Sequence, residues 1–119
     1  MKMPSVLTGF GLALFLLFPC SLFAAGKGLA AGQKLYDSRC ARCHGLNAKG
    51  NLDSAKSLGL DPLKLDLTRE VVLKKSRKDL EKLVMGGHGR MPKQEALSLD
   101  QVRSILKYLQ TLQKAYVMK

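Results

Sequence analysis

Cys40-Ala41-Arg42-Cys43-His44 is the stretch that decides how this chain of 119 residues folds. The pattern is C-x-x-C-H, the signature for covalent attachment of a c-type haem. The two thiols can form thioether bonds with the two vinyl groups of a haem, and the histidine that follows can ligate the iron from one face. Because the two intervening residues span about one helical turn, both sulfur atoms face the same side. The motif therefore predicts one covalently bound haem, held by Cys40 and Cys43 and ligated by His44.

Three other interpretations of the two cysteines are open. They could form a disulfide or a redox-active dithiol at the start of a helix. A thioredoxin-like dithiol protein would need alternating strands and helices, which the sequence pattern does not show. A tetrahedral zinc site needs two further ligands, and the chain offers only Cys20 and His88. The histidine directly after the second cysteine favours haem attachment over all three.

The N-terminal segment has the pattern of a secretory signal peptide. Lys2 is the only charged residue before Lys27, and an apolar run leads to small residues around Ala25. We expect residues 1–25 to be removed and residues 26–119 to form one domain. The alternative is an uncleaved N-terminal anchor, because the uncharged run before Lys27 is long enough to span a bilayer.

The predicted domain is poor in large apolar side chains. The chain has no tryptophan, and its four phenylalanines all lie in the predicted signal segment, at Phe10, Phe15, Phe18 and Phe23. A domain of this size is already marginal in the surface that it can bury. A buried haem would supply the large apolar centre that Leu, Val and Ile alone do not provide.

Hydrophobic periodicity predicts an all-α domain. Three helices are expected over residues 29–40, 77–85 and 99–113, and a weaker fourth over residues 68–74. Residues 45–66 are rich in glycine and polar side chains, and we expect them to form a long loop that a haem edge supports.

Two local signals refine the helices. Gly32 is costly inside a helix, so it indicates a close approach by another helix, and Tyr36 lies on the same face. Ser98 and Gln101 form a capping box at the start of the last helix. Tyr108, on the flank of that helix's apolar stripe, is expected to meet Gly32 and Tyr36.

The second axial position of the iron has four candidate ligands: Met85, His88, Met91 and Met118. Met91 is our choice, because a residue in the short loop between the last two helices can reach across a haem that helices surround. Pro92 restricts Met91 to extended conformations and would aim its thioether. His88 is the main rival, while Met85 is expected to pack at a helix end and Met118 to lie on a fraying tail.

The chain is strongly basic, with 20 Lys and Arg against 9 Asp and Glu and a net charge of +11. Five basic residues gather before and within the middle helix: Lys74, Lys75, Arg77, Lys78 and Lys82. They suffice as a solvated helix face, but they also fit a docking surface for an acidic redox partner, since charge speeds encounter. No nucleic-acid-binding motif accompanies the charge, so we expect no nucleic-acid partner.

Several segments together resemble the small monohaem class I cytochromes c of bacteria, over nearly the whole predicted domain. The resemblance rests on Leu35-Tyr36, Cys40-Ala41-Arg42-Cys43-His44-Gly45, Ala48-Lys49-Gly50, Asp66-Leu67-Thr68, Gly87 to Pro92, and Ile105 to Leu112. It implies a cytochrome c fold in which three to four short helices wrap around one covalently attached haem c, with the first and last helices crossing near Gly32 and Tyr108.

The resemblance also implies a function. With His44 as proximal and Met91 as distal ligand, the protein would transfer single electrons, have no catalytic residues, and work in the periplasm, where haem of this kind is attached. A membrane association is expected only if the N-terminal segment is uncleaved. The alternatives are a haem enzyme or small-ligand sensor with an open distal site, or an electron-entry subunit of a larger oxidoreductase. In this family a proline carbonyl often accepts the other N–H of the proximal histidine, and Pro62 is the candidate here.

Overall fold

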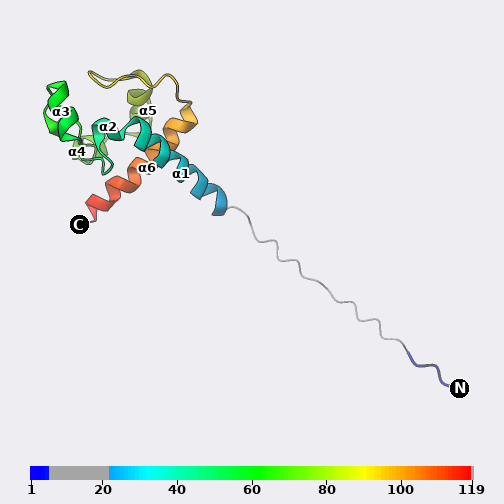
Figure 1. Cartoon of the computed structure of the whole chain (residues 1–119). Coiled ribbons are helices and arrows are strands. Elements are labelled where there is room, and N and C mark those ends of the chain that lie inside the picture. The colour runs from blue at the N-terminus through cyan, green and yellow to red at the C-terminus, as the bar shows by residue number, and fades with distance from the viewer. Residues whose placement is uncertain (6–21, 119) are drawn as a thin grey trace.

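The structure, a computed structural model, describes residues 1–5 and 22–118, and its regular elements within these ranges are helical (Figure 1). They are α1 (Leu22–Arg39), α2 (Ala41–His44), α3 (Leu52–Leu58), the 3-10 helix η1 (Pro62–Lys64), α4 (Glu70–Leu73), α5 (Arg77–Gly86) and α6 (Leu99–Val117). The all-α class is confirmed. The three helices expected with regular periodicity correspond to the three longest elements, α1, α5 and α6, and the set also contains several shorter helices.

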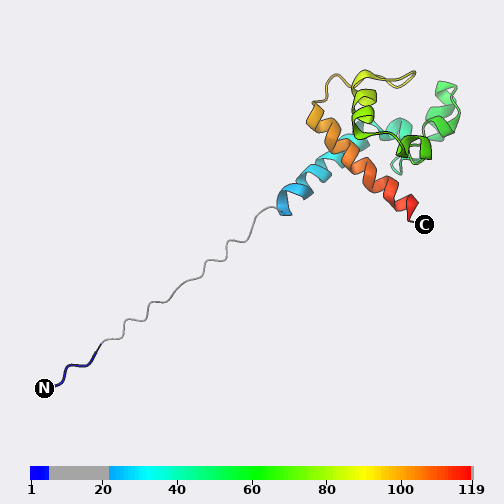
Figure 2. The same ribbon diagram turned by 180° about the vertical axis from the view of Figure 1, so that it is seen from behind.

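α1 and α6 cross as an X, which is visible from both sides of the molecule (Figures 1 and 2). The crossing point is Gly32, where an added Cβ would lie 2.0 Å from the backbone oxygen of Ser104 and 2.6 Å from its carbonyl carbon. One turn further along α1, the ring of Tyr36 packs edge-to-face on Tyr108, with 5.6 Å between the ring centroids. The crossing predicted near Gly32 and Tyr108 is therefore confirmed, and it needs a residue without a side chain at Gly32.

The apolar stripe of α6 forms the largest part of the core. Val102, Ile105, Leu106 and Leu109 are buried and pack in one cluster with Tyr36 of α1. Because i, i+3, i+4 and i+7 positions share one side of a helix, these four side chains all face α1 and α5.

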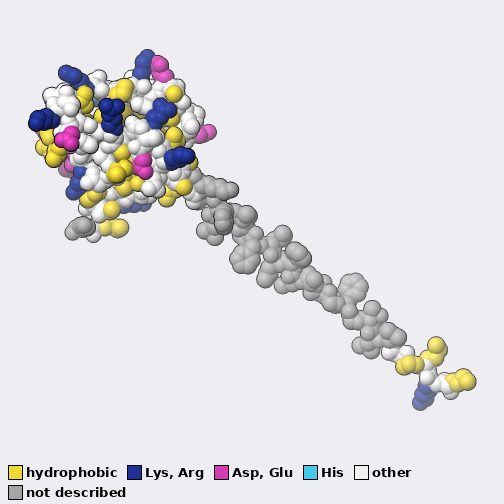
Figure 3. All heavy atoms as spheres, viewed as in Figure 1, with side chains coloured by type: hydrophobic (Ala, Val, Ile, Leu, Met, Phe, Trp, Pro, Cys, Tyr) yellow, Lys and Arg dark blue, Asp and Glu magenta, His cyan; other side chains and the backbone are white. Residues whose placement is uncertain are grey.

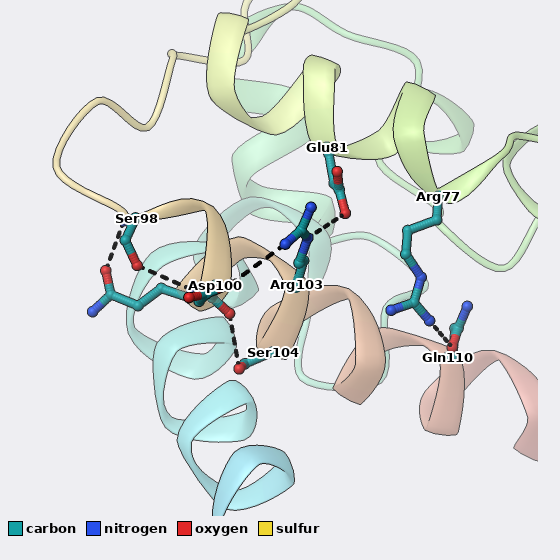
Figure 4. Close-up of polar contacts among 8 residues, drawn as sticks. Arg77, Glu81, Ser98, Asp100, Arg103, Ser104 and Gln110 are labelled. Atoms are coloured by element: carbon teal, nitrogen blue, oxygen red, sulfur yellow. Dashed lines mark hydrogen bonds and ion pairs between the residues drawn. The ribbon is translucent and has the colours of Figure 1, made fainter.

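The start of α6 is capped as predicted (Figure 4). The backbone N–H of Gln101 donates to the Ser98 hydroxyl at 3.2 Å, and the Ser98 N–H donates to the Gln101 side-chain oxygen at 2.8 Å. This reciprocal pair satisfies two of the backbone donors that a helix start leaves free.

α5 lies against α6 and is joined to it by exposed polar contacts (Figure 4). Arg103 donates to the Glu81 carboxylate at 3.1 Å, and Arg77 donates to the Gln110 side-chain oxygen at 3.3 Å. Polar pairs at the surface contribute about 0–1 kcal/mol each, so the apolar contacts between α5 and α6 matter more for holding the two helices together.

The prediction of a long loop over residues 45–66 is wrong, because this segment contains α3 and η1. Asn51 caps α3 by accepting the Ser54 N–H at 3.0 Å, and Gly59 ends it in the left-handed conformation with φ 62°. Asp61 caps η1 by accepting the Leu63 N–H at 2.9 Å. Both helices are too short to show a hydrophobic period, so capping residues were their only sequence signal.

The other boundaries differ by smaller amounts. α1 begins at Leu22 rather than at residue 29, and α6 continues to Val117 rather than ending at residue 113. The weak fourth helix is the single turn α4. α1 runs through the expected cleavage position at residue 25; most of the predicted signal segment, residues 6–21, lies outside the described residues, so its removal stays a prediction. None of the described helices is long and apolar enough to cross a membrane.

The crossing gives a testable pair of substitutions within α1. Gly32→Ala places a methyl group against the Ser104 backbone, which cannot move without displacing α6, so we expect the free energy of unfolding to fall by about 3 kcal/mol or more. Gly28→Ala is the control, because nothing lies within 4 Å of an added Cβ there. It should leave the melting temperature unchanged or slightly raised, since alanine favours helix. Equal melting temperatures for the two variants would contradict the close crossing.

Candidate functional site

The C-x-x-C-H motif forms the corner between α1 and α2. The Cys40 N–H donates to the Tyr36 carbonyl at 2.8 Å and the His44 N–H donates to the Cys40 carbonyl at 2.9 Å, so the motif follows α1 with almost no break. Both cysteines are free thiols and partly buried. Burial raises the pKa of the Cys40 thiol to about 11, with Arg39 opposing and Cys43 adding to the shift. Cys40, Cys43 and His44 therefore lie together within one helical turn.

One ring nitrogen of His44 forms a hydrogen bond, which leaves the other available as a ligand. Its Nδ1 lies 2.8 Å from the carbonyl oxygen of Leu65. Because a carbonyl only accepts, this contact assigns the proton to Nδ1 and leaves Nε2 with its lone pair. Burial lowers the pKa of His44, and the hydrogen bond to Leu65 partly opposes that shift. The lowered pKa favours the neutral imidazole, which is the form that ligates a metal.

The Leu65 carbonyl accepts the hydrogen bond from His44 Nδ1. The prediction that the Pro62 carbonyl would accept it is wrong. The Pro62 carbonyl accepts the Leu65 N–H at 3.0 Å within η1. It is therefore turned into η1, while the Leu65 carbonyl, three residues on, faces His44. Sequence reasoning missed this group because a backbone carbonyl has no side-chain signature.

The loop after His44 folds back on the motif. The Gly50 N–H donates to the His44 carbonyl at 2.7 Å, and the Asn51 N–H donates to the Cys43 carbonyl at 2.9 Å. Gly50 has φ 91°, and an added Cβ would lie 3.1 Å from the Pro62 oxygen and 3.2 Å from the Leu65 Cβ. A glycine here allows the loop to pass close to the segment that carries the Leu65 carbonyl.

A second anchor of this loop comes from α1. The hydroxyl of Tyr36 donates to the Gly45 carbonyl at 2.9 Å, and the Tyr36 side chain is only 1% exposed. Burial raises the pKa of Tyr36 far above its ordinary value, so the hydroxyl stays a donor at any physiological pH. The residue directly after His44 is therefore held by the helix that precedes the motif.

Met91 lies in a tight turn between α5 and α6. Its backbone N–H and carbonyl both pair with His88, at 2.9 and 3.0 Å. Gly87, with φ 73°, begins the turn, and a side chain there would approach the Met91 oxygen and the Lys93 nitrogen to 2.8 Å. These contacts fix the backbone that carries Met91.

The four candidates for the second iron ligand differ in how far they are buried. Met91 and Met85 are partly buried and pack on the same core cluster as Cys40, whereas His88 and Met118 are exposed. Met85 lies within α5, and Met91 alone combines contact with the core and a place on a loop. The structure thus brings Met91 and the motif to one apolar cluster.

The residues present suit a covalently attached haem. Two free thiols one turn apart match its two vinyl groups, and a neutral imidazole with its Nδ1 engaged matches an axial ligand. Basic side chains spread over the face shown in Figure 3, with fewer acidic ones among them. The five clustered basic residues, two between α4 and α5 and three within α5, are all exposed.

Comparison with known proteins gives one match. A family model described as Cytochrome c matches residues 29–113, which include the motif, the Leu65 carbonyl, Met91 and most of both crossing helices. No curated protein and no solved structure matches the chain.

The two packed tyrosines allow a test of the Tyr36 anchor. Tyr36→Phe keeps the ring but leaves the Gly45 carbonyl without its donor, so we expect the free energy of unfolding to fall by about 1–2 kcal/mol. Tyr108→Phe, in the ring that Tyr36 touches, removes a much less buried hydroxyl and should change it by less than about 0.5 kcal/mol. Denaturant unfolding of the haem-loaded protein measures both. A loss for Tyr108→Phe as large as that for Tyr36→Phe would refute the anchor.

Proposed function

The chain belongs to the cytochrome c family, whose members bind covalently attached haem c, and we propose that it is a diffusible one-electron carrier. In this proposal Cys40 and Cys43 form the two thioether bonds, and His44 and Met91 are the axial ligands. The observation that carries it is the hydrogen bond from His44 Nδ1 to the Leu65 carbonyl. A partly buried imidazole held by one nitrogen, next to two free thiols in the sequence, suits axial ligation better than any other role.

The protein residues have separate tasks. The thiols hold the haem, the Leu65 carbonyl orients the His44 ring and raises its basicity, and the apolar cluster around Tyr36 keeps water away. The bound haem supplies the one-electron couple. Methionine opposite histidine raises the reduction potential of c-type cytochromes.

Met91 also decides between a carrier and an enzyme. His44 and Met91 together would hold a bound haem without leaving a position for substrate, so the chain would need no catalytic residue. The fixed turn around Met91 and its contact with the core support this closed arrangement. An open distal site, as in a haem enzyme or a ligand sensor, would need Met91 to lie elsewhere.

The proposal extends to place and partner. The signal-like segment supports export to the periplasm, with membrane association only if that segment is retained. The net charge of +11 and the exposed basic cluster support docking on acidic redox proteins. Complexes of this kind are small and transient, and charge attraction speeds their formation.

Met91→Ala tests the second ligand. The oxidised wild-type protein should show the near-infrared charge-transfer band of a methionine–iron bond, and Met91→Ala should lose it and lower the reduction potential. Met85→Leu, the matched control on the same core cluster, and His88→Ala should both keep the band. The assignment is wrong if Met91→Ala leaves the spectrum unchanged, or if His88→Ala or Met85→Leu abolishes the band.

A further inference from the structure

Gln113 is an unusual residue in the core face of α6. Among the described residues, Gln113 is the one buried polar side chain, with an exposure of 8%. Its neighbours on this face, Leu106 and Leu109, are apolar. An amide in such a place is unfavourable unless it is hydrogen-bonded. Its Nε2 donates to the carbonyl of Leu67 at 2.8 Å, across 46 positions of sequence.

Leu67 is held from its other side as well. Its N–H donates to the Ala48 carbonyl at 2.7 Å. Ala48 is fully buried and has φ 62°, a conformation that a residue with a side chain rarely adopts. Both polar backbone groups of Leu67 are thus fixed, one by the loop after His44 and one by α6.

The two hydrogen bonds that hold Leu67, from its N–H to Ala48 and from Gln113 to its carbonyl, form a clamp. The Leu65 carbonyl lies two residues before it. Upstream, the Leu65 N–H is bonded to Pro62 in η1. Downstream, the Asp66 carboxylate accepts both the N–H and the hydroxyl of Thr68 at 2.7 Å. The segment from residue 62 to residue 68 is therefore bonded at both ends, and the carbonyl that meets His44 Nδ1 at 2.8 Å lies between the two anchors.

We propose that Gln113 is a positioning residue for His44, acting through Leu67 and the Leu65 carbonyl. This inference rests on the proposed function, since it takes His44 as the iron ligand. The Gln113 amide fixes the Leu67 peptide, the Leu67 peptide fixes the orientation of the Leu65 carbonyl, and that carbonyl sets the strength of the His44 Nδ1 hydrogen bond. α6 thereby tunes the ligand as well as packing the core.

The direction of the effect follows from the hydrogen bond. A strong bond from Nδ1 makes the imidazole a better electron donor and stabilises oxidised iron, which lowers the reduction potential. Without the Gln113 amide, the partly buried Leu67 carbonyl loses its donor, and the segment shifts to find another one. The bond from His44 then weakens, and the reduction potential rises.

Gln113→Met tests this, because methionine has nearly the same length and removes the donor. In the haem-loaded protein we expect a higher reduction potential than in the wild type. We also expect the His44 Nδ1 proton to exchange with solvent about fivefold to tenfold faster, as for the loss of one hydrogen bond. NMR of the reduced protein measures this exchange.

Two controls on α6 separate positioning from stability. Gln110→Met removes an exposed amide that accepts from Arg77 at 3.3 Å, and Ile105→Val removes a buried methyl group at the crossing. Both should lower stability slightly and leave the potential and the proton exchange at wild-type values. The inference is overturned if Gln113→Met behaves like these controls, or if they shift the potential as much as it does.

The wild-type protein provides a further measurement should Gln113→Met fail to fold. If the clamp holds the segment as one unit, the Leu67 amide and the His44 Nδ1 proton exchange with the same opening free energy and the same denaturant dependence. Different dependences overturn the inference. A wild-type spectrum that lacks histidine ligation would instead overturn the proposed function, and this inference with it; intact ligation with an unchanged Gln113→Met protein overturns this inference alone.

Discussion

The close approach of two backbones at Gly32 and Ser104 is the constraint on which the rest of the structure depends. An added Cβ at Gly32 would lie 2.0 Å from the Ser104 oxygen, so the helices can touch only where a side chain is missing. That contact buries Tyr36 one turn later, and the motif begins four residues after Tyr36. The same crossing directs the second half of α6 to Leu67. One arm of the crossing thus leads into the C-x-x-C-H motif, and the other reaches the segment that carries the Leu65 carbonyl.

The surroundings of the motif are made mostly of backbone groups. The carbonyls of Gly45 and Leu65 accept from Tyr36 and His44, and the N–H of Gly50 donates to the His44 carbonyl. Such groups are fixed by the path of the chain, so they depend on packing elsewhere. This explains why the core keeps a buried tyrosine and a buried glutamine.

Much of the fold could be predicted from the sequence, because its signals are local or follow a helical period. The motif, the capping box at Ser98 and the small residue at Gly32 each reflect a requirement that only certain residues meet. α3 and η1 were missed because they have only one or two turns and few apolar residues. The start of α1 could not be predicted, because its first residues, 22–25, lie within the predicted signal segment.

The candidate site residues could be named from the sequence to the extent that side chains define them. Cys40, Cys43 and His44 follow from one motif, and Met91 from a Met-Pro pair in a loop of suitable position. The Leu65 carbonyl and the Gln113 amide could not be found in this way, since the first is a backbone group and the second matters only through a contact across 46 residues. Such contacts come from tertiary structure and have no local pattern.

The central claim is that His44 and Met91 ligate the haem iron from its two faces. The protein would then carry electrons and perform no chemistry on small ligands. Exposure of the reduced wild-type protein to carbon monoxide at neutral pH tests this most directly. We predict an absorption spectrum that carbon monoxide leaves unchanged. A rapid, stoichiometric carbon monoxide adduct of the native protein would show an open or labile distal position and contradict the account.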